Sequence, residues 1–214
     1  MSISEKQRQK KLLKKNKKRK LKKNISAISG HPKVGPSHYA KYPIHECFIP
    51  NTLFETGLGY VIITRKTPDG FIAVSAFVVD VHCLGVKNAL FTVKSEIEYE
   101  SSVKPKLMRS SDEGNFENVH PTCARKLIEG AVLYAKNFGF SPHPDYNDIK
   151  GIFGNIDPDL CPVKFEYGKN GKPYYIRGPN ESVDKAKQIV DKLSKKCGEG
   201  NYDYILMLDE GMVE

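Results

Sequence analysis

The clearest apolar pattern in the chain predicts a helix over residues 121–138. Apolar side chains recur there with a 3.6-residue period, at positions 124, 127, 128, 131, 134, 135 and 138. Pro121 in the first turn and Gly139 after the last are typical start and stop signals of a helix. We therefore expect this helix to lay one face against a core.

A second pattern predicts a hairpin of two buried strands at residues 60–66 and 71–80. Apolar side chains occupy successive positions in both, which indicates strands that are covered on two faces. The turn between them reads Thr-Pro-Asp-Gly, in which Pro68 presets the first turn dihedral and Gly70 accepts a positive φ. Further elements are expected in this order: a strand at 44–49, a strand at 89–93, and a short helix followed by a loop within 94–118.

The C-terminal third predicts a closing unit of hairpin, helix and strand. Its elements are expected as a short helix at 146–153, strands at 163–167 and 173–177, a helix at 181–196 and a strand at 202–208. Asn170-Gly171 is a strong hairpin signal, Asn180 is a suitable N-cap, and Gly198 suits the position after a helix. The predicted fold class is α+β: an antiparallel, hairpin-rich sheet with packed helices, plus a C-terminal β-hairpin/helix/strand unit.

Charge divides the chain more sharply than hydrophobicity does. Residues 1–24 hold twelve Lys or Arg against one acid, Glu5, a net charge of +11, whereas the rest of the chain holds 22 basic and 24 acidic residues. Few apolar side chains occur in this segment, so it is expected to be disordered. The predicted domains are a disordered polybasic arm and linker (1–41), an α+β core (42–140) and a closing unit (141–214), the last either separate from the core or continuous with it.

The polybasic arm carries the strongest functional signal. Each Lys ammonium is a mobile point charge that displaces a counterion from a phosphate backbone, so we expect residues 1–24 to bind nucleic acid or the ribosome. The residues expected to do so are Lys10, Lys11, Lys14, Lys15, Lys17, Lys18, Arg19, Lys20, Lys22 and Lys23. The arm has no aromatic side chain on which a base could stack. The alternatives are a solubilising tail, a nuclear-import peptide and contact with an anionic membrane surface.

Five cysteines, at positions 47, 83, 123, 161 and 197, form no CxxC pair and no pattern typical of a disulfide framework. Buried free thiols in a reducing compartment are therefore expected. The N-terminal charges are not followed by the apolar stretch of a secretory signal, and no apolar run is long enough to predict a membrane span. The sequence thus predicts a cytoplasmic protein.

The densest polar cluster lies in the sequence VVDVHCLGVKNAL, directly after the second hairpin strand. Its members are Asp80, His82, Cys83, Lys87 and Asn88. Cys83 is a candidate nucleophile, but His82 is its neighbour on an extended chain and points to the opposite face. A base would have to come from elsewhere, with His45 and His120 as candidates. Packed core thiols are the simpler interpretation, and no catalytic residue is assigned.

A metal site is a second hypothesis. His45 and Cys47 are two residues apart and would share one face of a strand, and Cys83 or His82 would supply a third ligand, although no standard zinc spacing is matched. Consecutive antiparallel strands followed by a helix are also similar to the start of a ribonuclease H-like fold, but Asp80 and Glu129 lack an evident third carboxylate for a two-metal nuclease. No metal and no cofactor is therefore assigned.

Two adjacent tyrosines offer a contact that the arm lacks. Tyr174 and Tyr175, near Lys169, Lys172 and Arg177, could stack on RNA bases. The alternative is that one ring lies in the core and the other outside, as neighbours in a strand do.

Four stretches, HECFIPNTLFETGLGYVIITRK, VVDVHCLGVKNA, HPTCARKLIEGAVLYAKNFGF and YGKNGKPYYIRGPNES, together resemble a group of bacterial proteins that also begin with a Lys-rich arm. The resemblance covers about residues 1–210, and its most distinctive part is Cys-Leu-Gly-Val-Lys. It implies a bacterial cytoplasmic setting and brings no activity with it. We predict a nucleic-acid- or ribosome-associated protein without assigned catalysis. The alternatives are a Cys83-centred or metal-dependent hydrolase or nuclease, and an adaptor that binds a protein partner.

Overall fold

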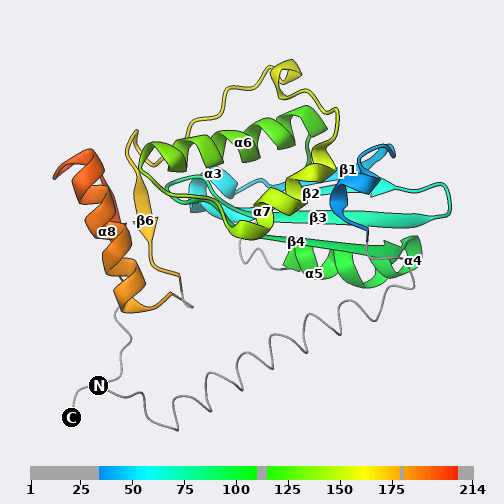
Figure 1. Ribbon diagram of the computed structural model, residues 1–214, viewed down its shortest axis with the longest axis horizontal. Coiled ribbons are helices and arrows are strands. Elements are labelled where there is room, and N and C mark those ends of the chain that lie inside the picture. Colours follow the sequence, from blue (N-terminus) through cyan, green and yellow to red (C-terminus); the bar gives the residue numbers. More distant parts are fainter. Residues whose placement is uncertain (1–33, 110–114, 179–180, 207–214) are drawn as a thin grey trace, which may run out of the picture.

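One antiparallel sheet forms the centre of the protein. The computed structural model describes residues 34–109, 115–178 and 181–206. In these residues the sheet has five strands in the order β4-β3-β2-β1-β5, with helices on both faces (Figure 1). The strands are β1 (Ile44–Pro50), β2 (Leu58–Lys66), β3 (Phe71–Asp80), β4 (Gly85–Ser95) and β5 (Phe116–Asn118). The α+β class predicted from the sequence is confirmed.

The β2–β3 hairpin forms as the pattern of the sequence predicts. Thr67 N–H donates to the carbonyl oxygen of Phe71 at 2.8 Å, and Gly70 has a φ of +80°. Both strands are buried on two faces because successive side chains alternate between two cores: Ile63 belongs to one core and Ile62 to the other.

Helices cover the two faces of the sheet unequally. Helix α6 (Pro121–Asn137) crosses one face and buries Leu127 and Ile128 completely, as its 3.6-residue period predicts. The other face is covered by α4 (Glu96–Glu98), the π-helical turn η1 (Tyr99–Val103) and α5 (Lys104–Arg109). Tyr99 is the largest side chain buried there, against β1 to β3. The strand β5, which follows, was not expected from the sequence.

The core extends beyond the predicted limits of 42 and 140. Before β1, the short helix α2 (Pro36–Tyr39) buries Tyr39 against the α6 side of the sheet. After α6, the expected short helix forms as α7 (Pro144–Ile149) and the turn η2 (Lys150–Phe153), and both contribute to the same core. The remaining short helices are α3 (Leu53–Thr56) and η3 (Pro158–Leu160).

A β-α-β unit stands at one end of the sheet, as Figure 1 shows for α8 and β6. It consists of β6 (Tyr174–Ile176), α8 (Val183–Cys197) and β7 (Asp203–Ile205), and β6 pairs with β7 in parallel. Ser182 is the N-cap, its side chain accepting from Lys185 N–H at 3.2 Å; the expected cap, Asn180, lies outside the described residues. Residues 146–153 of the predicted closing unit (141–214) belong to the core of the sheet, so from here on the closing unit means residues 168–206 only.

The predicted strand at 163–167, and hence its hairpin with 173–177, is wrong. The turn does form, since Lys169 N–H donates to the carbonyl oxygen of Lys172 at 2.8 Å. The segment before it lies instead along α6: the Tyr167 hydroxyl donates to the carbonyl oxygen of Leu127 at 3.0 Å, and the Phe165 ring stacks on Phe54. Contacts with a helix, which no local pattern encodes, outweigh the β-propensity of this segment.

Candidate functional site

Asp80 ends β3 and shapes the turn into β4. Its Oδ1 accepts hydrogen bonds from the backbone N–H groups of His82 at 3.0 Å and Cys83 at 2.8 Å. Burial raises the pKa of the carboxyl to about 6, although Lys87 and the backbone N–H groups act in the opposite direction. These bonds are those of an Asx turn, so the carboxylate serves the fold of the turn.

The side chains of His82 and Cys83 diverge as expected, although the two residues lie in a turn and not on the extended chain that the sequence suggested. His82 Nε2 lies 3.0 Å from the carbonyl oxygen of Phe54, so this nitrogen carries the proton, and burial lowers the pKa of the ring. The ring packs directly on Gly57, where a Cβ would lie 2.1 Å from Nδ1. His82 therefore ties α3 to the end of β3 as a neutral side chain.

Cys83 is fully buried in the core of the closing unit, beside Tyr175 and Leu193. Burial raises the pKa of its thiol far above the ordinary value, with Asp80 adding to the effect. A nucleophilic cysteine needs the opposite shift, toward the thiolate. This environment argues against the hypothesis of an enzyme centred on Cys83.

Lys87 lies where β4 carries a bulge, between the pairs Val78–Asn88 and Val79–Val86. A bulge re-aims a side chain. Here the Lys87 ammonium reaches the carboxylate of Glu181 at 3.2 Å, just before α8. The polar cluster expected from the sequence thus serves the junction between the sheet and the closing unit, and a shallow pocket at this junction is lined in part by Asp80, His82 and Lys87.

The three metal ligands suggested by the sequence are not brought together. His45 and Cys47 do not share a face, because β1 has an irregularity in which two residues, 45 and 46, stand opposite Thr64. Cys47 enters the core under α6, whereas the His45 ring packs against Tyr99 on the other face. Cys83 lies beyond the opposite end of β3.

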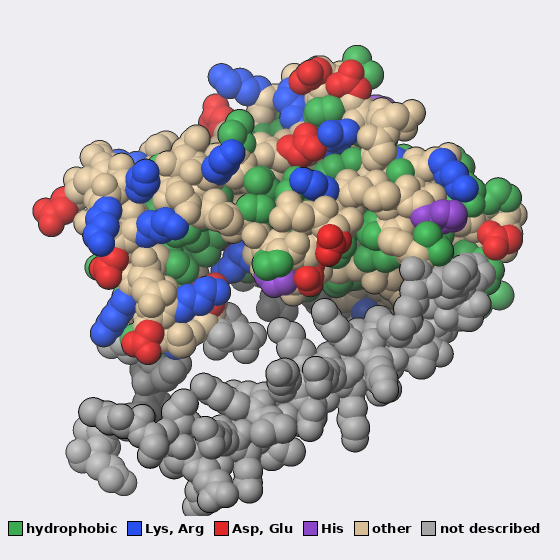
Figure 2. Space-filling view, in the orientation of Figure 1, with side chains coloured by type: hydrophobic (Ala, Val, Ile, Leu, Met, Phe, Trp, Pro, Cys, Tyr) green, Lys and Arg blue, Asp and Glu red, His purple; other side chains and the backbone are tan. Residues whose placement is uncertain are grey.

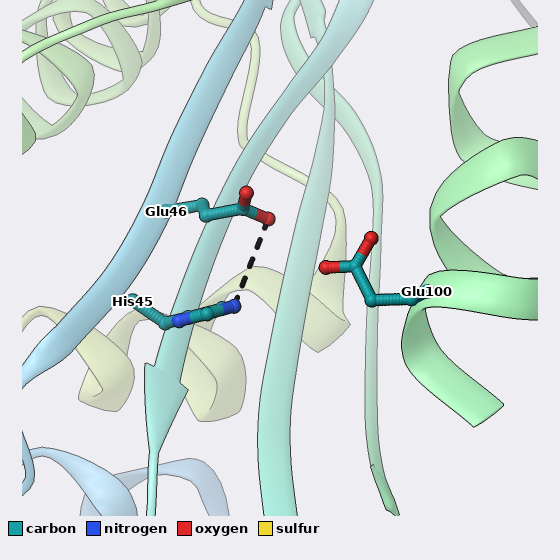
Figure 3. Close-up of side chains that lie close together, drawn as sticks. All are labelled: His45, Glu46 and Glu100. Carbon is teal, nitrogen blue, oxygen red and sulfur yellow. Dashed lines mark ion pairs between the residues drawn. The ribbon is translucent and has the colours of Figure 1, made fainter. Parts of the chain in front are cut away.

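The same bulge creates a cluster that the sequence did not suggest, His45, Glu46 and Glu100 (Figure 3). One potential ligand atom from each lies within 4.8 Å of the others. Glu46 Oε2 is 3.9 Å from His45 Nε2, a nitrogen that is buried without a hydrogen-bond partner. Among the described residues this is the group whose chemistry comes closest to a metal site.

Lys104 already supplies the cation that these carboxylates attract. Its ammonium lies 2.7 Å from Glu46 Oε1 and 3.3 Å from Glu100 Oε2, and the Tyr99 hydroxyl donates to Glu46 Oε2 at 2.8 Å. Burial acts to lower the pKa of Lys104, but hydrogen bonds and attraction to the two carboxylates outweigh it and raise the pKa overall. The cluster is therefore an ion-pair network that holds η1 and α5 on the sheet.

Two of the five cysteines form a disulfide, contrary to the expectation of free thiols. Cys123 in the first turn of α6 is bonded to Cys161, 38 residues later in the chain. Lys126 Nζ also donates to the Cys161 carbonyl oxygen at 2.7 Å, so the bond and the lysine together hold residue 161 against α6. Disulfides persist in oxidising compartments and are rare in the cytosol, so this bond does not support the predicted cytoplasmic location.

Positive charge gathers on the closing unit. Residues 168–206 contain eight Lys or Arg and five Asp or Glu, a net charge of +3, whereas residues 34–167 contain thirteen and sixteen, a net charge of −3. Figure 2 shows blue side chains collected at the end of the molecule where α8 lies. The exposed lysines of this helix are Lys185, Lys187, Lys192, Lys195 and Lys196. Cations in the last turn also suit the negative end of the helix dipole, which is a structural reason for some of them.

The two tyrosines suggested as stacking platforms both make contacts within the protein. Tyr175 is fully buried, and its hydroxyl donates to Glu181 Oε2 at 2.7 Å. Tyr174 is half-buried, with the Lys169 ammonium 4.7 Å from its ring centroid and the His82 ring beside it. The alternative, in which one ring lies in the core and the other outside, describes the arrangement better.

A different aromatic pair, which the sequence interpretation missed, lies on the surface. Tyr202 and Tyr204 stack on one another, with ring centroids 6.0 Å apart. Their spacing of two residues in a predicted strand was the signal that could have found them, because such residues share a face. The ten cationic residues of the polybasic arm lie outside the described residues.

Comparison with known proteins found no matching family model, no matching curated protein and no matching solved structure. None of the helices in the described parts of the chain is long and apolar enough to cross a membrane.

Proposed function

We propose that the protein binds nucleic acid, free or within the ribosome, through the phosphate backbone, and that residues 1–24 supply most of the affinity. The observation that carries this proposal is the crowding of twelve Lys or Arg with one acid into those residues. Phosphate contacts by lysine need no exact geometry, so this binding is strong, salt-dependent and weakly selective.

The charge of the remaining chain supports the assignment of most of the affinity to residues 1–24. Residues 25–214 are close to neutral, and the part that includes the five-stranded sheet is net negative. Such a body does not attract a polyanion as a whole. The closing unit, at +3, is the described part that favours a phosphate backbone, so it is the part of the body expected to meet nucleic acid held by the arm.

Binding of fluorescently labelled single-stranded RNA, measured by anisotropy at several salt concentrations, tests the proposal. If six to ten of the cations contact phosphates, log K falls with log salt at a slope of about −4 to −7. Replacing the ten arm residues from Lys10 to Lys23 by Gln should weaken binding more than 100-fold at low salt and bring the slope close to zero.

A matched variant separates the arm from general surface charge. Four exposed lysines of the sheet-containing part, Lys41, Lys106, Lys136 and Lys150, are replaced by Gln in one protein. In the other, the same replacement is made at Lys14, Lys15, Lys17 and Lys18. The proposal requires a clear loss of affinity in the second protein and little change in the first. Equal effects, or RNA affinity with an unchanged salt slope after removal of residues 1–24, would contradict it.

The proposal includes a cytoplasmic location in a bacterium, which the resemblance of the sequence suggested and where nucleic acid is accessible. The Cys123–Cys161 bond makes this part testable. Alkylation of thiols in intact cells, followed by mass spectrometry, reads the redox state of both cysteines. Free thiols at both positions agree with a reducing compartment, and a quantitative disulfide contradicts it.

A further inference from the structure

The stacked pair Tyr202–Tyr204 is the most exposed aromatic feature of the closing unit. The two ring planes are 18° apart, so the rings are nearly parallel. Tyr202 is half-buried and packs against the core formed by α8 and β6, whereas Tyr204 is 47% exposed. The inner ring therefore supports the outer one, and the outer ring keeps an aromatic surface in contact with solvent.

One lysine contacts the backbone beside this pair, and two more precede the pair in the chain. The Lys172 ammonium donates to the carbonyl oxygen of Gly200 at 2.6 Å, two residues before Tyr202. Lys195 and Lys196 are exposed in the last turn of α8, and the connection from that turn to β7 is held by Asn201, whose Nδ2 donates to the Cys197 carbonyl oxygen at 3.0 Å. The Lys172 ammonium is thus held against the backbone that leads into the aromatic pair, and Lys195 and Lys196 precede the pair by six to seven residues in the chain.

Two acidic residues, Glu199 and Asp203, lie close to the pair in the chain. Asp203, the first residue of β7, lies between the two tyrosines in the chain, so its side chain points away from theirs. Glu199 lies in the exposed connection after α8. The exposed ring of Tyr204 thus offers a face on which flat, uncharged groups can stack, with the Lys172 ammonium at Gly200 available to a phosphate.

We propose that Tyr202 and Tyr204, with Lys172, Lys195 and Lys196, form a stacking site for the unpaired bases of a single-stranded nucleic acid. This inference rests on the proposed function and gives it a substrate class. Lysines attract the phosphates of any polyanion, but an aromatic face is useful only where base faces are accessible, and in a duplex they are covered by their neighbours. The arm, which lacks aromatic residues, cannot make this distinction.

The test uses the full chain and three labelled probes of one length: single-stranded RNA, single-stranded DNA and duplex DNA. Tyr204→Ala removes the outer ring, and Tyr204→Phe keeps a ring without the hydroxyl. Affinity for at least one of the two single strands should fall about 5- to 100-fold in Tyr204→Ala and stay near the wild-type value in Tyr204→Phe. Affinity for the duplex and the salt slope should not change, because the phosphate contacts remain.

Failure of this inference differs from failure of the proposed function. Wild-type protein that binds single strands through its arm, together with a Tyr204→Ala variant of equal affinity, overturns the stacking site alone. Equal losses for single strands and duplex also overturn it. No binding of the wild-type protein to any probe overturns both proposals. Tyr204 is half exposed, so Tyr204→Ala should unfold at the wild-type temperature, and Lys195→Gln with Lys196→Gln provides a second variant that leaves the rings intact.

Discussion

The sheet-containing part of the protein and the closing unit are built differently. The large part buries both faces of its sheet under helices, has a disulfide that joins α6 to Cys161, and has a net negative charge. The closing unit has one small core under α8, a two-stranded parallel sheet whose strand β7 is exposed along its whole length, and a net positive charge.

This difference suggests that the large part supplies stability and that the closing unit supplies a surface for binding. Parallel strands usually have both faces covered, so the exposed parallel strand β7, with Tyr204 on it and Tyr202 just before it, is an unusual surface. In the large part, by contrast, polar side chains hold the fold together: Asp80 in a turn, His82 against α3 and Glu46 in an ion-pair network. Three predictions probe this contrast, in order of expected effect.

The first concerns Arg65, which is 3% exposed in β2. Its Nε and Nη2 donate to the carbonyl oxygens of Ile152 and Phe153, both at 2.8 Å, and Nη1 donates to that of Tyr42 at 2.5 Å. Arg65→Met removes all three hydrogen bonds of a buried guanidinium, so the free energy of unfolding should fall by about 3–5 kcal/mol in urea titrations.

Lys66→Met is the matched control for Arg65→Met. Lys66 follows Arg65 in β2 but pairs with Glu96 in a partly exposed ion pair, at 2.7 Å. Its replacement should change the free energy of unfolding by less than about 1 kcal/mol. Similar losses in the two variants would show that the buried guanidinium does not hold α2 and η2 on the sheet.

The second prediction concerns the junction. Because burial raises the pKa of Asp80 to about 6, the folded protein binds a proton more tightly than the unfolded chain does. The free energy of unfolding should therefore fall as pH rises from about 4 to about 6, with a contribution of about 2–3 kcal/mol from this group. Asp80→Asn keeps an oxygen for the two backbone N–H groups and removes the charge, so it should abolish this decline and stabilise the protein at pH 7.

Urea titrations at pH 4, 5, 6 and 7 measure this effect as the difference between variant and wild type. Asp148→Asn, at an exposed position in α7, serves as the control and should follow the wild-type curve. An Asp80→Asn curve that runs parallel to that of the wild type over the whole window would refute the role of the buried carboxyl.

The third prediction concerns Glu181, which joins the closing unit to the sheet. Burial acts to raise the pKa of this carboxyl, but the Tyr175 hydroxyl and the Lys87 ammonium outweigh it and lower the pKa. The stabilisation is thus present above the ordinary carboxyl pKa and is lost as pH falls through the lowered one. Glu181→Gln should cost about 1–2 kcal/mol at pH 7.

Amide hydrogen exchange locates this loss. Protection should decrease in β6 and α8 and stay constant in the β2–β3 hairpin, because the closing unit has its own core. Glu199→Gln, at an exposed site in the same unit, should leave both regions unchanged. Faster exchange throughout the sheet would mean that the two parts unfold together.

Local patterns predicted those elements that have a regular spacing of apolar residues and clear turn residues at their ends. The β2–β3 hairpin and α6 follow from alternating or 3.6-residue apolar positions bounded by Pro and Gly. β5, only three residues long, has no such period and exists because it pairs with the end of β1. The candidate site was less predictable still, since two bulges decide where His45 and Lys87 point.

The sequence by itself determined the α+β class, the main hairpin, the long helix and the separation of a strongly cationic N-terminal segment from a nearly neutral remainder, because each is a property of neighbouring residues. Only the tertiary structure decided that Cys123 meets Cys161, that residues 163–167 lie along a helix instead of in a hairpin, and that Tyr202 and Tyr204 are left on an exposed strand. Those outcomes depend on contacts between segments far apart in the chain, whose energies no local pattern contains.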